Sequence, residues 1–303
     1  MKTSKSPNQI ALVAYRTAQQ SLPAYSSKYS PKKFTLHQLA ACLVLKAFFE
    51  TDYRGIAAIL EDSSDLRKIL ELTEDVPHFT TLQKASSKIC DRKTTRKLVH
   101  KLILFARREG GIPSSISMAA IDSTGLESHH ISSYFVHRRA DTESAKWQFL
   151  RYSRYPKLDC ICDCRTHLIL SSSASRGPAF DGKYYTPLLE DVTKQGMSPK
   201  TLLADAGYDS EYSHTYARER YGIRTIIPAR RTRSSSKLPK GRYRRLMATR
   251  FPKALYGQRW QVETVFSMIK RNLGSFLSAR TYWSQCREIS LRVFTHNIMV
   301  VRP

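Results

Sequence analysis

The amino-acid sequence predicts an α/β protein in which a mixed β-sheet flanked by helices follows an all-helical N-terminal region. The helical region is predicted because apolar residues such as Leu36, Leu39 and Leu43 recur every three to four positions. The sheet is predicted because, after residues 110–113 (Gly-Gly-Ile-Pro), short β-like runs alternate with helical runs. That order of elements is typical of layered α/β folds rather than of barrels or bundles.

Residues 110–113 also mark the predicted domain boundary, which divides the 303 residues into a helical region, 1–112, and a second domain, 113–303. Helical runs in the second domain occupy 186–194 and 210–221, and Thr186 followed by Pro187 is a typical helix start. The β-like runs of this domain occupy 118–123, 158–164, 167–173, 201–204 and 223–228.

The charge of the chain is strongly positive. Lysine and arginine number 50 and aspartate and glutamate 25, which gives a formal net charge of +25 at pH 7. Such an excess favours a polyanionic partner, either nucleic acid or an anionic membrane surface. We expect no membrane partner, because the sequence has no basic amphipathic helix and no run of about 18 apolar residues. The polar first six residues do not resemble a secretory signal, so a cytoplasmic location is expected.

The positive charge is concentrated in residues 229–253. No carboxylate occurs between Glu219 and Glu263, whereas 13 lysines and arginines occur from Arg220 to Arg259. Most runs of charged residues are solvated surface faces. A run that carries only positive charge, however, is destabilised by repulsion between its side chains unless an anion binds to it. We therefore predict that this stretch contacts a phosphate backbone. The candidate DNA-binding residues here are Arg230, Arg231, Arg244 and Arg245.

The six cysteines are too sparse for a disulfide framework. Cys160, Cys162 and Cys164 alternate along a predicted strand, so their thiols should share one face. Zinc sites usually pair cysteines as C-x₂-C rather than C-x-C, so we interpret these three as buried small hydrophobic residues.

Two aspartates, Asp122 and Asp205, each end an apolar β-like run and precede small residues that leave room for a ligand. The ends of buried parallel strands are where open α/β sheets place their sites. For each aspartate taken alone, the favoured interpretation is that it caps a turn or the helix that follows it.

A third carboxylate, Glu263, lies on a predicted amphipathic helix over residues 255–273. At about 100° per residue, Tyr256, Arg259, Glu263 and Lys270 form one stripe along this helix. Arg259 and Glu263 are four positions apart, so they could also form an ordinary surface ion pair.

The stripe Tyr256-x₂-Arg259-x₃-Glu263-x₆-Lys270 resembles the signature of insertion-sequence transposases of the DDE superfamily, most closely the groups named for insertion sequences four and five. The segments around Asp122 (Ala-Ile-Asp-Ser-Thr) and Asp205 (Ala-Asp-Ala-Gly-Tyr-Asp) resemble those that hold the first and second aspartates of these enzymes. Residues 39–82 are similar to their helical DNA-binding region, so the resemblance covers most of the chain.

The resemblance implies a ribonuclease H-like catalytic fold with Asp122, Asp205 and Glu263 as catalytic residues and metal ligands. Three carboxylates can hold two divalent ions about 3.5 to 4 Å apart for an in-line displacement. Mg²⁺ suits this all-oxygen ligand set, and Mn²⁺ is expected to substitute for it. By the same resemblance, Tyr256, Arg259 and Lys270 are expected to contact DNA phosphates.

The implied activity is DNA transposition, in which metal-dependent cleavage at the transposon ends frees a 3′-hydroxyl that attacks target DNA. The implied partners are double-stranded DNA, as terminal repeats and as target, and a second copy of the chain in a homodimer assembled on DNA. The resemblance also implies a bacterial, nucleoid-associated protein.

Three alternatives stay open at this point: a catalytically silent DNA-binding protein derived from a transposase, a nuclease of the same fold that does not join DNA, and an RNA-binding protein. The last predicts an aromatic and basic motif that the sequence does not show.

Several residues near these motifs have simpler interpretations. Asp209 is predicted to cap a helix together with Ser210. Trp147 and Trp260 could stack on an unpaired base, but packing in a core or groove is the expected role. Three histidines that follow the first aspartate are expected to be mainly structural: His129, His130 and His137.

Overall fold

The computed structural model describes residues 3–113, 115–128, 155–177, 179–230 and 238–301. The chain divides into two compact units, one formed by Met1–Pro113 with Met268–Pro303 and the other by Ser114–Ser267. Across the described residues, no helix combines the length and the apolar character that a membrane span requires.

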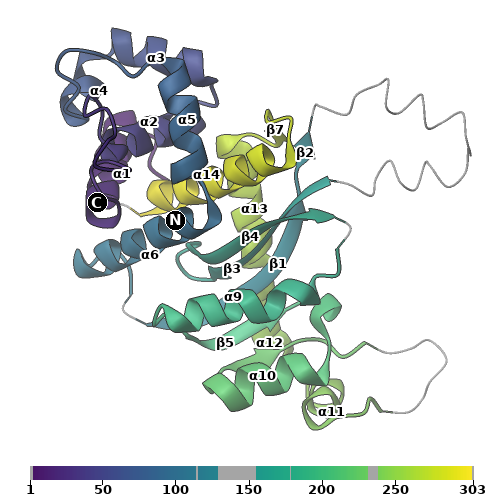
Figure 1. The fold of residues 1–303 in the computed structure, drawn as a ribbon. Helices are drawn as coiled ribbons and strands as arrows, with labels where there is room; N and C mark the ends of the chain where they lie inside the picture. Colours follow the sequence, from purple (N-terminus) through teal and green to yellow (C-terminus); the bar gives the residue numbers. More distant parts are fainter. Residues whose placement is uncertain (1–2, 114, 129–154, 178, 231–237, 302–303) are drawn as a thin grey trace, which may run out of the picture. The chain divides into compact units, whose positions relative to one another are not determined.

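The first unit is helical (Figure 1). Its helices begin where the sequence supplies capping groups: Ser6 accepts a hydrogen bond from the backbone of Gln9, and Thr35 and Gln38 form a reciprocal capping box. The helices are α1 (Pro7–Ser21), α2 (Leu36–Phe48), α3 (Tyr53–Asp62), α4 (Ser64–Ile69), α5 (Phe79–Ile89), α6 (Arg92–Arg108) and α14 (Tyr282–Val300), and a short strand, β7 (Phe276–Leu277), precedes α14. The predicted helical N-terminal region is confirmed.

The C-terminal helix α14 packs against α1, α2 and α6 of the helical unit. Its second half is buried on all sides, so its sequence shows no polar face from which a packing partner could be inferred. The predicted domain 113–303 included this segment, whereas the packing assigns residues from Met268 onward to the helical unit. The functional division at residue 112, into a DNA-binding region and a catalytic domain, stays a prediction.

The second unit is built on a five-stranded mixed sheet with the order β4-β3-β1-β5-β6 (Figure 1). β1 pairs antiparallel with β3, and β3 with β4, while β1, β5 and β6 run parallel. The strands are β1 (Ile116–Gly125), β3 (Tyr155–Asp163), β4 (Ile169–Gly177), β5 (Pro199–Ala204) and β6 (Arg224–Ile226), with a short β2 (Glu127–Ser128) after β1.

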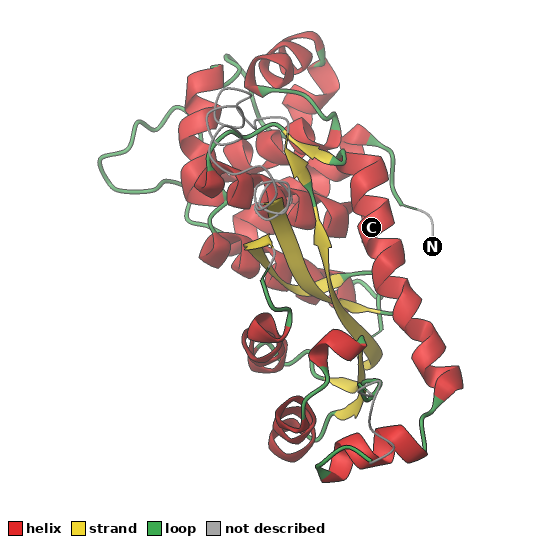
Figure 2. Cartoon of the chain, turned by 90° about the vertical axis from the view of Figure 1, so that its right-hand side faces the viewer, coloured by secondary structure: helices red, strands yellow, loops and turns green. Residues whose placement is uncertain are grey.

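Helices (red) lie on both sides of these strands (yellow) in Figure 2. α9 (Gly182–Lys194) packs on β3 and β4, α10 (Glu211–Tyr221) packs on β6, and the 3₁₀ turn η2 (Gly257–Arg259) contacts β5. A second 3₁₀ turn, η1 (Ala206–Tyr208), follows β5, and α11 (Arg242–Thr249), α12 (Lys253–Tyr256) and α13 (Trp260–Leu273) complete the elements. The predicted ribonuclease H-like α/β fold, a mixed sheet flanked by helices, is therefore confirmed.

Two predicted helices differ in extent from the observed ones. α9 begins at Gly182, four residues before the predicted start at Thr186, and Pro187 lies inside it. The buried side chain of Tyr185 anchors this extra turn, because its hydroxyl donates a 2.9 Å hydrogen bond to the carbonyl of Ser213. The helix predicted over 255–273 is divided into α12, η2 and α13, so Tyr256 and Arg259 precede the α-helix that carries Glu263.

Candidate active site

Asp122 lies on β1, the central strand of the sheet. The three residues before it, Ala119, Ala120 and Ile121, are completely buried. Its carboxylate Oδ1 accepts a 2.8 Å hydrogen bond from the backbone N–H of Ser123. The side chain itself is 17% exposed, so it is accessible although its strand belongs to the core.

Asp205 follows directly after β5, which is parallel to β1. The Cα of Ile121 pairs with that of Ala204. Asp122 and Asp205 each come one residue later, so they occupy equivalent positions on adjacent strands, which lie about 4.8 Å apart. The structure thus brings the first two predicted carboxylates together at the position where open α/β sheets place their sites.

The loop after Asp205 requires a glycine. Asp205 Oδ1 accepts a 2.8 Å hydrogen bond from the N–H of Gly207, and a Cβ at position 207 would lie 2.7 Å from that same oxygen. The small residues that follow Asp205 in the sequence therefore serve to let the backbone turn close beneath its carboxylate.

The two aspartates influence each other electrostatically. Burial raises the pKa of Asp122 to about 6, and the negative charge of Asp205 adds to this increase. The N–H of Ser123 and the charge of Arg259 act in the opposite direction without cancelling the effect. The charge of Asp205 thus adds electrostatic repulsion to the cost of burying Asp122.

Arg259 supplies the positive charge nearest to Asp122. Its guanidinium donates a 2.8 Å hydrogen bond to Asp122 Oδ2 and a 2.5 Å hydrogen bond to Glu263 Oε1. Burial raises the pKa of the nearby Tyr256 phenol, and the charge of Arg259 acts in the opposite direction. Arg259 and Glu263 thus form the ion pair that their spacing allowed, but the same guanidinium also reaches the first aspartate.

Glu263 is the least enclosed of the three predicted carboxylates, with 56% of its side chain exposed. Within the part of the chain that the structure describes, no three histidine, cysteine, aspartate or glutamate side chains are arranged to hold one metal ion. Asp122 and Asp205 thus lie at equivalent positions of adjacent strands. Glu263 is linked to Asp122 through the guanidinium of Arg259, which binds both carboxylates.

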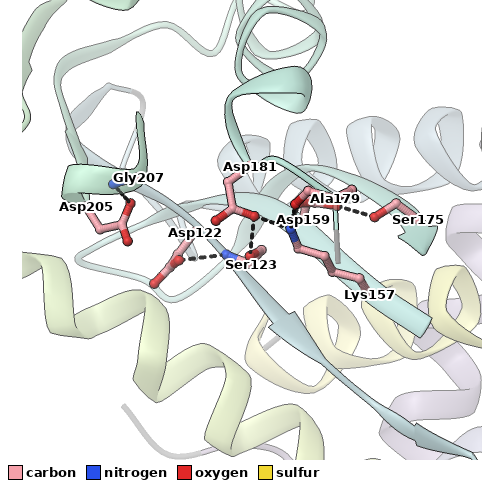
Figure 3. A network of polar contacts seen from close by, with 9 residues as sticks. All are labelled: Asp122, Ser123, Lys157, Asp159, Ser175, Ala179, Asp181, Asp205 and Gly207. Carbon is pink, nitrogen blue, oxygen red and sulfur yellow. Dashed lines mark hydrogen bonds and ion pairs between the residues drawn. The ribbon is translucent and has the colours of Figure 1, made fainter. Parts of the chain in front are cut away.

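Sequence reasoning missed a charged network beside Asp122, shown in Figure 3. Lys157 and Asp159 lie on β3 and are almost completely buried, with side-chain exposures of 4% and 0%. Lys157 forms an ion pair with Asp181, which also accepts a 3.1 Å hydrogen bond from the hydroxyl of Ser123. The signal that could have revealed this network is the occurrence of Lys157 and Asp159 within the largely apolar run that forms β3.

The predicted phosphate-binding arginines have different surroundings. Arg244 forms a two-pronged ion pair with the fully buried carboxylate of Asp209, at 2.7 to 3.1 Å. Asp209 also accepts a hydrogen bond from the N–H of Arg230. The prediction that Asp209 caps a helix is therefore wrong, because its carboxylate is occupied by Arg244 and Ser210 alone caps α10. Arg245 is exposed and donates to the carbonyl of Pro239. None of these contacts tests DNA binding.

The remaining predicted residues lie elsewhere. Lys270 belongs to the helical unit, where it lines a cavity of about 310 Å³ together with Lys46 and Glu50. Trp260, for which packing in a core or groove was predicted, is 54% exposed, so packing in a core is wrong and packing in a groove stays a prediction. The predictions for Arg231, Trp147 and the three histidines, His129, His130 and His137, fall outside the described residues.

The cysteine prediction agrees with the structure. Cys160 and Cys162 are fully buried on β3, and Cys164 follows them with 8% exposure. None of the six cysteines, all of which lie among the described residues, forms a disulfide. Burial raises the pKa of the Cys164 thiol to about 12, so this side chain stays protonated at neutral pH.

Comparisons with known proteins give the following matches. A family model described as the transposase DDE domain matches residues 113–298, which is more than half of the chain. A solved structure, the piggyBac transposase synaptic complex with hairpin DNA, aligns over 99% of this chain and 72% of that chain, with 12% identity and a TM-score of 0.45. No curated protein is a significant match.

Proposed function

Since the chain belongs to the transposase DDE domain family, we propose that it catalyses DNA cleavage at transposon ends and strand transfer into target DNA. Both steps are phosphoryl transfers, in which an oxygen nucleophile displaces another oxygen in line at phosphorus. Water is the nucleophile in cleavage, and the freed 3′-hydroxyl is the nucleophile in joining.

The observation that carries this proposal is the meeting of Asp122 and Asp205 at equivalent positions of two parallel strands. Asp122 accepts hydrogen bonds from the neighbouring N–H of Ser123 and from Arg259. Asp205 caps the turn η1 through Oδ1, which accepts from Gly207, so for this aspartate the metal role is proposed in addition to the capping role. Glu263 lies within reach of the guanidinium that binds Asp122.

The residues present fit divalent metal ions. Their donor atoms are carboxylate oxygens, which Mg²⁺ and Mn²⁺ prefer. Burial and, secondarily, the charge of Asp205 raise the pKa of Asp122, and a divalent cation would offset the repulsion between the two carboxylates. We propose that Asp122, Asp205 and Glu263 hold two such ions. When bound, the ions would activate the attacking oxygen and stabilise the leaving oxygen.

The cationic and phenolic groups beside the carboxylates have a complementary role in this proposal. Arg259 would bind a phosphate oxygen of the DNA and stabilise the charge that develops during transfer, because a guanidinium matches phosphate geometry in a two-pronged manner. Tyr256, which precedes Arg259 by three residues, would contact the DNA backbone. Lys270 and the exposed Arg245 are also proposed to bind DNA phosphates, whereas Arg244 is expected to stay paired with Asp209.

We further propose that the chain binds double-stranded DNA and acts as a homodimer on it in the bacterial nucleoid. The net charge of +25 supports the DNA partner, since a polyanion offsets the self-repulsion of such a protein. The second candidate function is a catalytically silent DNA-binding protein derived from a transposase. It is favoured by the exposure of Glu263 and by its separation from Asp205, because no three of the described carboxylates are arranged around one ion.

The experiment that separates these functions measures Mg²⁺-dependent cleavage and joining of DNA that carries the terminal repeats flanking the coding sequence. Wild type is compared with Glu263→Gln, which keeps the shape of the side chain but removes its charge, and with Glu127→Gln, a matched change at an exposed glutamate of the same unit. We expect wild type and Glu127→Gln to cleave and join, and Glu263→Gln to bind DNA but do neither. Binding by wild type without any nicking, in Mg²⁺ or in Mn²⁺, would favour the silent DNA-binding protein.

A further inference from the structure

We propose that Asp181, held in place by the buried Lys157, is a positioning residue that fixes the carboxylate of Asp122 for metal binding. The inference rests on the proposed function, because it assigns to Asp181 a role toward the metal ligand Asp122. It concerns side chains outside the predicted catalytic set, all of them in the sheet-containing unit.

The first argument is a continuous path of contacts, visible in Figure 3. Lys157 donates to Asp181 and, at 3.1 Å, to the carbonyl of Ala179, so the start of α9 is fastened to β3. Asp181 then accepts a 3.1 Å hydrogen bond from the hydroxyl of Ser123. The backbone N–H of that same serine donates to Asp122 at 2.8 Å. A shift of Asp181 would therefore move the residue whose N–H orients Asp122.

The second argument is the environment of Lys157, whose side chain is only 4% exposed. Its ammonium group forms ion pairs with Asp159 at 3.4 Å and with Asp181. Buried ion pairs are often no more stabilising than well-packed apolar side chains of similar volume, so fold stability alone does not explain this arrangement. A requirement to hold a particular carboxylate in place does explain it.

The third argument is the position of Asp181 itself, which is the N-cap residue of α9. An aspartate at that position normally accepts a hydrogen bond from a backbone N–H of the first helical turn. The backbone of Asp181 is already in the right-handed helical conformation, so its side chain makes no such capping bond, and its Oδ1 accepts from Lys157 and Ser123. The side chain of Asp181 thus bonds to residues of β1 and β3 rather than to the backbone of α9.

The structure offers a matched control on the same helix. Asp191, near the other end of α9, accepts a 2.6 Å hydrogen bond from the hydroxyl of Ser171 on β4. This is also a serine–aspartate contact between α9 and the sheet, and Asp191 is buried, with 6% exposure. A general loosening of α9 on the sheet would therefore follow from Asp191→Asn as well as from Asp181→Asn.

The test measures Mn²⁺ binding to the full-length protein by calorimetry, together with DNA cleavage. Substitution of groups that orient metal ligands typically costs 10- to 100-fold in affinity or activity. We expect Asp181→Asn and Ser123→Ala each to weaken Mn²⁺ binding about 10-fold and to lower kcat for cleavage without raising KM for DNA. Ser123→Thr, which keeps the hydroxyl, and Asp191→Asn should bind Mn²⁺ like wild type.

Three results would overturn the inference: wild-type Mn²⁺ affinity in Asp181→Asn, an equal loss in Asp191→Asn, or a loss in Asp181→Asn that Ser123→Ala does not share. Asp122→Asn distinguishes this failure from that of the proposed function. If Asp122→Asn abolishes Mn²⁺ binding while Asp181→Asn does not change it, only the positioning role is wrong. If Asp122→Asn also binds Mn²⁺ normally, the proposed metal site itself is wrong.

Discussion

Arg259 binds the carboxylate of Asp122 through a 2.8 Å hydrogen-bonded ion pair. The same guanidinium binds Glu263, so one cation serves two of the three proposed metal ligands. A divalent ion offers these carboxylates more charge than a guanidinium does and would compete with it for the same oxygens. Arg259 should therefore exchange its carboxylate partners for DNA phosphate when metal and substrate bind.

The first prediction concerns Arg259→Ala. Removing a competitor for the carboxylates should leave Mn²⁺ affinity equal to or higher than that of wild type. Removing a group that stabilises charge in the transition state should lower kcat for DNA cleavage by about 100-fold. Calorimetry with Mn²⁺ and a single-turnover cleavage assay measure the two effects separately.

Arg259→Lys is the matched variant, because it keeps the charge but loses the planar fork that reaches two acceptors at once. Its cleavage rate should lie between those of wild type and Arg259→Ala. If Arg259→Ala weakened Mn²⁺ binding as strongly as Glu263→Gln, the guanidinium would be supporting the metal ligands rather than competing for them.

The second prediction concerns the stability contributed by the Asp209–Arg244 ion pair. Asp209 is fully buried, so Arg244→Ala would leave its carboxylate with the N–H of Arg230 as its partner. Loss of one partner from a buried pair costs about 3 kcal/mol, and we expect a decrease of that order in the free energy of unfolding in urea. Arg245→Ala, at an exposed neighbour, should change this free energy by less than about 0.5 kcal/mol.

The third prediction uses the same two variants to identify which arginine contacts DNA. Each phosphate contact contributes about −0.9 to the slope of log affinity against log salt. Arg245→Ala should make the slope shallower by about one such contact, because its guanidinium is exposed. Arg244→Ala, measured at a temperature where it is fully folded, should leave the slope unchanged. The opposite result would mean that Arg244 leaves Asp209 for the DNA.

The fold and the first two carboxylates could be predicted from the sequence because both depend on local patterns. An apolar run that ends in an aspartate and small residues marks where a strand leaves the core: Asp205 directly follows β5, and Asp122 follows the buried part of β1, which continues to Gly125. Their adjacency could not be derived from spacing alone, because it depends on the parallel pairing of β1 with β5.

The polar interior of the site was not predictable, because it is formed by residues distant in the sequence. Lys157 and Asp181 are 24 positions apart, and neither belongs to a periodic pattern that would single it out. The pairing of Asp209 with Arg244 spans 35 positions. In both cases the sequence shows a charge, while only the fold shows the partner that makes burial of that charge tolerable.

The fourth prediction concerns the cysteines. Cys160 and Cys162 are fully buried, and burial raises the pKa of Cys42 and of Cys90 to about 12, whereas Cys286 is partly exposed. A thiol reagent added to the folded protein should modify Cys286 first, and the other five only after denaturation. EDTA should not increase the number of reactive thiols. An increase would indicate that Cys160, Cys162 and Cys164 bind a metal.

The fifth prediction concerns acid stability and His214. This histidine is completely buried on α10, with its Nδ1 2.6 Å from the hydroxyl of Thr225. Burial, together with the nearby charge of Arg218, lowers its pKa to about 4. The charges of Asp209 and Glu211 oppose this decrease without cancelling it. The folded protein therefore keeps His214 neutral at pH values where an unfolded chain, with a pKa of about 6.5, protonates it.

The sign of the effect follows from this difference in proton binding. Above pH 6.5 neither state is protonated at His214, so the full stability is present. As the pH falls from about 6.5 to about 4, the unfolded state binds the proton more readily and the free energy of unfolding decreases. Between pH 7 and pH 5 the loss should be about 1 to 2 kcal/mol.

His214→Asn should remove this loss, because the asparagine can still hydrogen-bond Thr225 but does not titrate. The comparison of urea unfolding at pH 7 and pH 5 in wild type and variant isolates the contribution of His214 from that of Asp122 and Asp159. The pKa values of these two aspartates are raised by burial, so protonation stabilises the folded state as the pH falls. An equal decrease in wild type and His214→Asn would show that another group causes the acid sensitivity.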